Sequence, residues 1–381
     1  MDAIARPSVV LLSANPWTTI RVADHHLAMA LAKYADVIFV DPPMSVLRLH
    51  VREWRPASRP RAVHPGVRAV TPIVQPGVRR GPTYLMSRRL TVLAARRALR
   101  RAPAAVISAQ PLFRVAGRLR EGRHAYWAQD DYVGGSALLG LSRGLLERVE
   151  PRVVGDADVV VASSPVVSDR WRGFRADVEL IPFGCDSELF AAASPAPPAI
   201  PTGSRPQTAL LSGQLNERLD LDILRGILDE GLRLVVVGPV TGDSPDLRRI
   251  LDHRGCSYFG KLPQAELPEV YSSCDVALVP YRDTPFNRSS FPLKTLEYLA
   301  AGLPVVATPL PSTLWLGSAD VHIAERVEDF VRLALACSTT RRDEDIARRR
   351  SFAAAHSWDA RARDWLRVLG IPIRHSEGTS S

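Results

Sequence analysis

The chain has 381 residues, a hydrophobic fraction of 46% and a formal net charge of +9. This length exceeds one ordinary domain, and the apolar content suffices for two cores. No apolar run reaches the ~20 residues that span a bilayer, and the first residues lack the pattern of a secretory signal peptide. The four cysteines show no paired spacing, which argues against a disulfide framework or a zinc site. These features favour a cytoplasmic protein of two domains.

The first half of the chain alternates short apolar runs with segments of helical length. The pattern predicts a helix over Val22–Tyr34, whose apolar residues share one face. Strands that alternate with helices indicate a parallel, doubly wound sheet. Residues 1–190 are therefore predicted to form a Rossmann-like domain. Its strands are expected at Val9–Leu12, Val37–Val40, Ala105–Ser108, Ala125–Ala128, Val159–Ala162 and Glu179–Ile181.

A second alternating pattern over 207–355 follows a Pro-rich stretch, 191–206, which is predicted to be a linker. The two domains are expected to face a central cleft, because open α/β sheets bind ligands at the carboxyl ends of their strands. Residues 356–374 are predicted to form an amphipathic helix and 375–381 a disordered tail. Expected strands are Ala209–Leu211, Leu234–Val237, Ser257–Phe259, Val276–Val279, Val305–Ala307 and Val321–Ile323, and expected helices are Leu219–Leu228, Leu267–Ser273 and Pro292–Ala301.

Arginines crowd residues 48–101. Such a region is either a basic face that contacts anionic lipid or an acidic acceptor, or a solvated surface of an arginine-rich protein. It lacks interleaved aromatic residues and matches no recognition motif, so nucleic-acid binding is not expected. Peripheral contact with the inner face of the membrane is the functional expectation for this region.

The segment 287–308, NRSSFPLKTLEYLAAGLPVVAT, is the most informative part of the chain. Pro292 suits the first turn of a helix, and Gly302 provides a stop signal. The free N–H groups of such a helix start suit a diphosphate. Glu297, about one turn further in, could accept two hydrogen bonds from a ribose diol. An ordinary strand–helix–strand unit with a weak Lys294–Glu297 pair explains the same spacing equally well.

This segment resembles the signature of GT-B glycosyltransferases of the large family 4 type, in which a nucleotide-binding Glu lies in a helix followed by A-G-x-P-V-V-A-T. The P-L-K-x-L-E-Y-L-A form looks closest to the branch with teichuronic-acid and other cell-surface polysaccharide transferases. Further similar segments follow in the family's order at 181–186, 211–215, 262–281 and from Trp358. The resemblance implies an α/β GT-B fold, with two Rossmann-like domains and a closing helix that crosses back to the first.

The resemblance also implies contacts to the sugar donor. Glu297 matches the second Glu of the family's E-x7-E pattern, which contacts the nucleotide ribose, whereas Ser289 stands where the first Glu is expected. Gln214 stands at the Arg position of the family's diphosphate clamp. Arg218 is the nearest second cation, with a solvent-facing arginine as the alternative, and Lys294 is a further phosphate cation. The predicted donor-binding set is Glu297, Arg218, Lys294, Ser289, Ser290, Gly213 and Gln214.

Candidates in the first domain lie near the expected carboxyl edge of its sheet. Asn15 and Trp17 follow the first strand and are predicted on the acceptor side. His25 begins the next helix and is a third acceptor-side candidate, although helix histidines are more often structural. Asp130 and Asp131 end a strand where the family often has a histidine or an acid. They are the predicted catalytic base or acceptor-orienting residues, with a capping aspartate as the alternative.

Two D-x-D strings are not expected to bind a metal ion. Asp156-Ala157-Asp158 precedes a strand, whereas a metal-binding D-x-D follows one, and Asp220-Leu221-Asp222 lies within a predicted helix. No metal and no cofactor are therefore expected, and the nucleotide sugar is a co-substrate.

The expected activity is a hexosyltransferase-type reaction from a UDP- or GDP-sugar to an acceptor hydroxyl. The family implies retention of configuration, and the acceptor is a glycan, a glycolipid or a small molecule in cell-surface polysaccharide, glycolipid or secondary-metabolite glycosylation. Two alternatives stay open. One is a GT-B sugar-nucleotide epimerase, and the other is a degenerate nucleotide-binding scaffold, which Ser289 and Gln214 favour.

Overall fold

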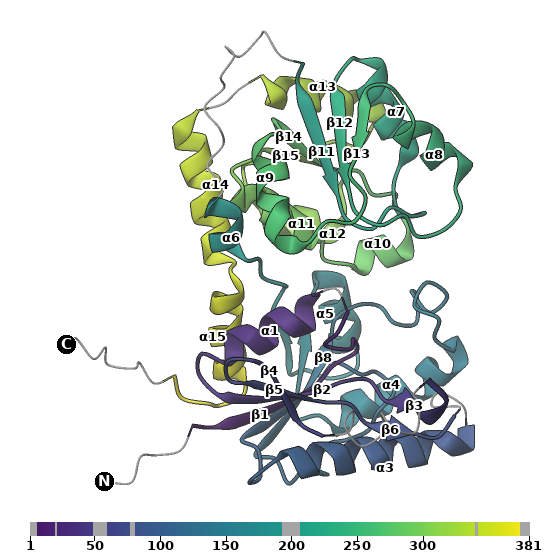
Figure 1. The fold of residues 1–381 in the computed structure, drawn as a ribbon, viewed down its shortest axis with the longest axis vertical. Helices are drawn as coiled ribbons and strands as arrows, with labels where there is room; N and C mark the ends of the chain where they lie inside the picture. Colours follow the sequence, from purple (N-terminus) through teal and green to yellow (C-terminus); the bar gives the residue numbers. More distant parts are fainter. Residues whose placement is uncertain are drawn as a thin grey trace, which may run out of the picture. The chain divides into compact units, whose positions relative to one another are not determined.

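The computed structural model describes residues 6–19, 21–48, 59–76, 81–192, 206–339 and 342–373. The chain divides into two compact units (Figure 1). The first comprises the residues up to Pro182 together with those from Trp358 onward, and the second comprises Phe183–Ser357. The chain therefore passes into the second unit at Phe183 and returns to the first at Trp358.

The first unit is built on an eight-stranded sheet of order β10-β9-β8-β7-β1-β2-β5-β4. Neighbouring strands are parallel except β4 and β5, which pair antiparallel at the edge. Every strand predicted in this half is present, with small shifts at the ends. The bounds are β1 (Ser8–Leu12), β2 (Asp36–Val40), β4 (Arg61–His64), β5 (Val67–Val70), β7 (Ala105–Ser108), β8 (Arg123–Ala128), β9 (Val159–Ala162) and β10 (Val178–Leu180); β3 (Met44–Ser45) and β6 (Ile73–Val74) form a separate pair.

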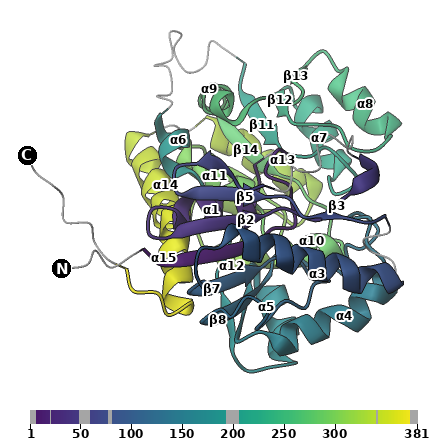
Figure 2. The ribbon, with the colours of Figure 1, turned by 60° about the horizontal axis from the view of Figure 1, so that its bottom comes forward.

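The two faces of this sheet are covered by different helices. One face packs on α3 (Gly81–Ala98) and α4 (Arg143–Asp156) through a continuous apolar cluster. Figure 2 brings this side forward and shows α3 running across it. The other face carries α1 (Ala23–Leu31) and α15 (Trp358–Val368), which pack against each other. There Trp365 meets Trp127 of β8 edge to face, with ring centroids 5.4 Å apart. The first unit is thus a three-layer α/β structure.

The second unit has a six-stranded, fully parallel sheet of order β13-β12-β11-β14-β15-β16. Separate apolar clusters fill its two faces, as expected when helices cover both sides. Its strands are β11 (Thr208–Ser212), β12 (Arg233–Val237), β13 (Cys256–Tyr258), β14 (Val276–Val279), β15 (Val305–Ala307) and β16 (Val321–Ile323). One face carries α7 (Leu221–Asp229), α8 (Pro245–Leu251) and α13 (Val327–Ser338), and the other carries α6 (Ser187–Ala192), α9 (Leu267–Ser272), α11 (Leu293–Ala300) and α14 (Asp343–Ala355) (Figure 1).

The second unit begins before the predicted linker. Phe190 of α6 stacks on Tyr271 of α9 with ring centroids 5.1 Å apart, so α6 belongs to this unit. The N–H of Cys185 donates to the carbonyl of His356 at 3.1 Å, which ties the start of the unit to its end. Residues 193–205 of the predicted linker and the predicted tail lie outside the described residues.

No helix within the described ranges is both long enough and apolar enough to cross a bilayer.

Candidate functional site

The second unit brings Lys294 and Glu297 together on α11. The helix starts at Leu293, after Pro292 at its N-cap, and therefore sits where the motif predicts it. Lys294 Nζ donates to Glu297 Oε2 at 2.6 Å, and Glu297 is only 6% exposed. Burial lowers the pKa of the Lys294 ammonium, but the charge of Glu297 and this hydrogen bond outweigh burial and hold that pKa above its ordinary value. Lys294 is therefore a protonated partner of Glu297.

Two buried tyrosines fasten this helix to the end of β11. The hydroxyl of Tyr271 lies 2.8 Å from Ser212 Oγ and 3.3 Å from Glu297 Oε2. The hydroxyl of Tyr298 accepts from the N–H of Ser212 at 2.8 Å and donates to its carbonyl at 3.1 Å. Burial raises the pKa of both phenols well above the ordinary value, so both keep their protons. Glu297 is thereby connected to the strand end that leads into Gly213.

Glu297 keeps one carboxylate oxygen open. Its Oε2 atom takes both described contacts, whereas Oε1 accepts no hydrogen bond from the described part of the chain. An ionised carboxylate oxygen accepts strong hydrogen bonds from hydroxyl donors. This geometry suits adjacent hydroxyls, such as those of a ribose.

Arg218 is held by a second set of contacts around α10 (Pro285–Ser289). Its Nε donates to Asn287 Oδ1 at 2.6 Å, and its guanidinium lies 4.9 Å from the ring centre of Tyr281 and 5.0 Å from that of Phe286. Asn287 also donates to the Arg218 carbonyl at 3.1 Å. Among the described residues neither terminal nitrogen of Arg218 has a hydrogen-bond partner. The planar fork is thus oriented and open to an anion.

Ser289 and Ser290 are both buried at the end of α10. Their hydroxyls donate to the carbonyl of Phe286 at 2.8 and 2.9 Å. The carbonyl of Ser290 accepts from Ser312 at 2.8 Å, which joins α10 to α12 (Pro311–Leu316). In this structure both serines stabilise the turn that precedes α11.

Gly213 and Gln214 form the loop directly after β11. Gly213 has a φ of +144°, which favours glycine, and a Cβ on Gly238 would lie 1.7 Å from its carbonyl oxygen. The close approach of the loops after β11 and β12 therefore requires glycine at 238, whereas glycine at 213 is favoured by its φ. Gln214 is exposed beside this contact.

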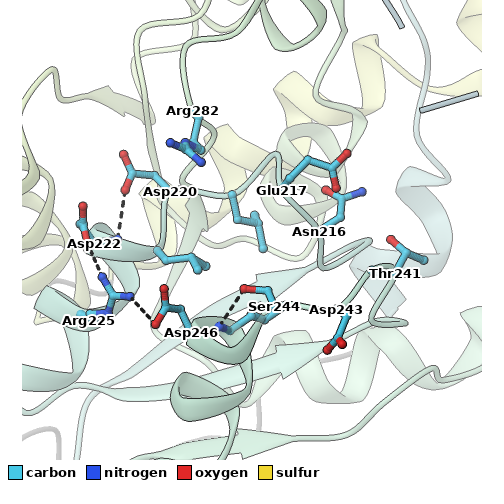
Figure 3. Close-up of a pocket in the computed structure, with 14 residues that line it drawn as sticks. Asn216, Glu217, Asp220, Asp222, Arg225, Thr241, Asp243, Ser244, Asp246 and Arg282 are labelled. Carbon is cyan, nitrogen blue, oxygen red and sulfur yellow. Dashed lines mark hydrogen bonds and ion pairs between the residues drawn. The ribbon is translucent and has the colours of Figure 1, made fainter. Parts of the chain in front are cut away.

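A cavity of about 430 Å³ adjoins the same loop (Figure 3). Carboxylates outnumber arginines in its lining, and Arg225 is already paired with Asp222 and lies 3.6 Å from Asp246. Arg248 and Arg249 lie outside the lining and pair with Asp243 and Asp246, so most of the negative charge of the lining is compensated. Arg218 is not part of it. The charged side chains that line the cavity are Glu217, Asp220, Asp222, Asp243, Asp246, Arg225 and Arg282.

In the first unit, Asp24 organises the loops that carry the predicted residues. This fully buried carboxylate accepts from Ser13 Oγ at 2.5 Å, from Asn15 Nδ2 at 3.3 Å and from Gln129 Nε2. It lies in the first turn of α1, where the helix dipole favours a negative charge. The loop after β1 is thereby tied to the end of β8, directly before Asp130. Sequence analysis did not single out Asp24, although an acid in the first turn after a buried strand was a visible signal.

Trp17 and His25 pack with Phe39 in an aromatic cluster. The His25 ring stacks on Phe39 with centroids 5.3 Å apart and lies 5.3 Å from the Trp17 ring. Both ring nitrogens of His25 lie 3.1 Å from backbone atoms of the adjoining turn, and the residue is fully buried. The backbone N–H of Trp17 donates to Oδ1 of the buried Asp41 at 2.8 Å. The structure therefore places His25 in the interior.

Asp131 is enclosed by its own turn. Its Oδ1 accepts from the N–H of Gly134 at 3.0 Å and pairs with Arg170 on α5 (Pro165–Arg172). A Cβ at Gly134 would lie 2.4 Å from Asp131 Oδ2, so a side chain there would displace the Asp131 carboxylate. Asp130, the other predicted catalytic residue, is half-buried next to Gln129. The structure thus sets Asp131 in an ion pair and Asp130 beside the Asp24 network.

A buried glutamate, Glu150, lies on the other side of the Asp131–Arg170 ion pair, next to Arg170. Glu150 Oε2 is 3.6 Å from Arg170, and its Oε1 accepts from the hydroxyl of Tyr126 at 2.8 Å. Burial raises the pKa of Glu150 to about 7, although Arg170 and Tyr126 act in the opposite direction. Arg170 therefore links the predicted catalytic loop to a group that titrates near neutral pH.

Both D-x-D strings are engaged in the fold. Asp156 pairs with Arg114 at 2.6 Å, and Asp158 accepts from the N–H of His124 at 2.7 Å. Asp220 caps α7 rather than lying inside it, and Asp222 pairs with Arg225. In the part of the chain that the structure describes, no group of three or more His, Cys, Asp or Glu side chains could hold a metal ion.

Part of the second unit matches a known protein family. The model of the glycosyl transferases group 1 family matches residues 216–338, which include Arg218, Lys294 and Glu297. TuaH of Bacillus subtilis (strain 168), which is assigned to teichuronic acid biosynthesis as a glycosyltransferase, is 27% identical over 259 residues. The match covers 64% of this chain and 65% of TuaH, so it spans slightly less than two thirds of that relative.

Solved structures resemble the chain over nearly its whole length. Sucrose-phosphate synthase from Thermosynechococcus elongatus superposes with a TM-score of 0.70 at 17% identity, over 96% of this chain and 98% of that one. HepE of Anabaena, solved with UDP and glucose, gives a TM-score of 0.67 at 12% identity over 96% and 99% of the two chains. An Escherichia coli trehalose-6-phosphate protein bound to UDP-2-fluoro glucose gives 0.68 at 14% identity over 96% and 100%. The fold is therefore GT-B, and residues 216–338 of the second unit match the glycosyl transferases group 1 family.

Proposed function

We propose that this chain transfers a glycosyl group from a UDP- or GDP-sugar to a hydroxyl of a glycan, a glycolipid or a small molecule, with the second unit binding the donor. The observation that carries the proposal is the open Oε1 of Glu297 on a helix fastened to the loop of Gly213. That oxygen lies in the segment that the family model matches. Its acceptor character suits the ribose hydroxyls of a nucleotide.

Arg218 is the group proposed to bind the donor diphosphate. Its terminal nitrogens are open, and Asn287 with two aromatic rings fixes the plane of its guanidinium. A preoriented cation stabilises the charge that develops on a leaving diphosphate without reorganising during the reaction. Lys294 acts through Glu297 in this proposal, because the two form an ion pair in the described structure.

Similar proteins support the proposed classes of donor and acceptor. Two solved structures of similar fold hold UDP with glucose or UDP-2-fluoro glucose, which supports a UDP-sugar. TuaH is assigned to teichuronic acid biosynthesis, which supports a polysaccharide acceptor. Retention of configuration and independence from metal belong to the same proposal. The D-x-D aspartates support the latter because each already has a partner within the fold.

We further propose that the protein is cytoplasmic and peripheral at the inner face of the membrane. The support is the arginine-rich region 48–101. Residues 49–58 and 77–80 of this region lie outside the described residues.

Calorimetric titration of the purified chain with UDP, GDP, dTDP and ADP tests the donor site. We expect one nucleotide to bind and Glu297→Gln to weaken it more than about 30-fold, because hydrogen bonds to a charged group are worth about 1.5–3 kcal/mol each. Glu325→Gln is the matched control, since Glu325 is an exposed carboxylate of the same unit. Binding of no nucleotide, or equal binding by wild type and Glu297→Gln, would contradict the site.

Product analysis separates the alternatives. Transfer of the sugar to an added acceptor supports the proposed activity. A changed sugar nucleotide without acceptor would identify an epimerase, and nucleotide binding without turnover would identify a scaffold.

A further inference from the structure

α3 has a buried face and an exposed face of unusual composition. The helix has 18 residues and is about 27 Å long. Ser87, Thr91, Val92 and Ala95 are buried towards the sheet. On the exposed side, Leu85, Met86 and Leu93 keep 50%, 49% and 40% of their surface in contact with solvent.

Arginines share the exposed side with these apolar residues. At 100° per residue, the six exposed side chains fall within a sector about 120° wide. We name this sector the α3 outer face. It consists of Leu85, Met86, Arg89, Leu93, Arg96 and Arg97.

The α3 outer face is positively charged without compensation from its own helix, since α3 contains no acidic residue. Arg96 donates to the carbonyl of Arg118 at 3.0 and 2.6 Å, which brings a further arginine to this side. Burial lowers the pKa of the neighbouring Arg88 guanidinium, and the like charge of Arg118 and Arg114 lowers it further. The positive charges here are therefore close enough to repel one another.

Mixed apolar and basic side chains match a lipid surface better than water. A solvated helix face needs no large apolar side chain, whereas a bilayer offers phosphates above and hydrocarbon beneath. Arginine stems can lie along that boundary with their guanidinium groups at the phosphates. Nucleic acid would require aromatic stacking or a recognition motif, and α3 has neither on this face.

We propose that the α3 outer face docks onto a bilayer that contains anionic phospholipids. This inference rests on the peripheral membrane contact proposed above and assigns that contact to one helix face. It does not depend on the donor site, because it involves the first unit alone.

Vesicle flotation of the full chain, without nucleotide, tests the proposal. Vesicles of phosphatidylcholine alone are compared with vesicles that also contain phosphatidylglycerol, at low and high NaCl. We expect binding only to the anionic vesicles, and weaker binding at high salt. Arg89→Gln with Arg97→Gln should weaken binding about 30-fold, from the attraction of two basic side chains to an anionic leaflet.

Matched controls separate this face from net charge and hydrophobicity. Arg233→Gln with Arg254→Gln removes the same charge from exposed positions of the second unit and should change binding less than about twofold. Leu85→Ser with Leu93→Ser should weaken binding at least tenfold, from the loss of inserted apolar groups, whereas Leu138→Ser with Leu139→Ser removes equally exposed leucines elsewhere and should not.

Three results would overturn the proposal. They are absence of binding to anionic vesicles, equal weakening by the α3 variants and their controls, and displacement by inorganic phosphate beyond that by NaCl of the same ionic strength, which would reveal a discrete anion pocket. The α3 variants should bind nucleotide as the wild type does. If the wild type bound no nucleotide, this would count against the donor site but would not affect the vesicle result.

Discussion

The ammonium nitrogen of Lys294 lies 2.6 Å from Oε2 of Glu297, one turn further along α11. Replacement of Lys294 by Met would leave a largely buried carboxylate without its cation. We expect the free energy of unfolding to fall by about 2–4 kcal/mol. Urea denaturation measures this loss. Lys261→Met, at an exposed lysine without an ion pair among the described residues, should change stability by less than about 0.5 kcal/mol. Similar losses in the two variants would show that the ion pair contributes little.

Asp24→Asn is expected to destabilise the first unit. The substitution keeps the shape of the side chain but turns one acceptor group into a donor, so at least one of Ser13, Asn15 and Gln129 loses its acceptor in the interior. An unsatisfied buried donor costs about 1–3 kcal/mol. Chemical denaturation followed by tryptophan fluorescence reports the change. Asp36→Asn, on an exposed carboxylate at the start of β2, is the control and should leave the midpoint unchanged.

His124 makes stability depend on pH in the acidic range. Both of its ring nitrogens are buried and lack a hydrogen-bond partner among the described residues. Burial lowers its pKa, although Glu121, Asp158 and Asp156 act in the opposite direction. The unfolded chain therefore binds more protons than the folded chain below the ordinary histidine pKa of about 6.5, so stability falls as pH drops through that value.

His124→Leu removes this dependence. The variant should gain about 1 kcal/mol near pH 7, because it removes an unsatisfied buried polar group, and the gain should grow towards pH 5. Urea midpoints measured between about pH 5 and 8 test both statements. A constant difference from the wild type across this range would show that His124 is not the titrating group.

Glu150 is expected to make stability depend on pH in the direction opposite to that of His124. Its pKa is raised from 4.5 to about 7 in the folded state, chiefly by burial. Between these values the folded chain binds more protons than the unfolded chain, so stability falls as pH rises through this window, by roughly 3 kcal/mol in total. Glu150→Gln should flatten this part of the profile and be more stable than the wild type above pH 7. Parallel profiles for the two proteins would contradict the assignment.

Buried parallel strands were predictable because both of their faces are apolar. Val159–Ala162 and Val276–Val279 read as uninterrupted apolar runs, and the observed strands have these bounds. The edge strand Arg61–His64 gives no such run, because an edge strand keeps one side in water. The helical pattern of α3 was hidden for a different reason. Its exposed face carries the apolar Leu85, Met86 and Leu93, and its buried face carries Ser87 and Thr91.

Only those residues of the candidate site that lie in a recognisable sequence motif were predictable. The position of Glu297 in a short helix before β15 follows from its segment alone. Its contact with Tyr271, and through Tyr271 with Ser212, depends on β11 and β14 being neighbours in the sheet. The ties from Asp24 to Gln129 depend on the order of the first sheet in the same way. Periodicity within one segment carries no information about which strands lie side by side.

Because the chain returns to its first unit after the second, the second unit is the first to be completed during synthesis. On the face of the first sheet that holds Trp127, this residue packs against Trp365 of α15, which follows the whole second unit in the sequence. The second unit has all of its residues as soon as Ser357 leaves the ribosome, while the first still lacks α15, one of the two helices on this face. A nascent chain released before Trp358 would therefore carry a complete second unit, whereas the first unit would expose the apolar surface around Trp127 that α15 covers, and exposed apolar surface promotes aggregation and recruits chaperones.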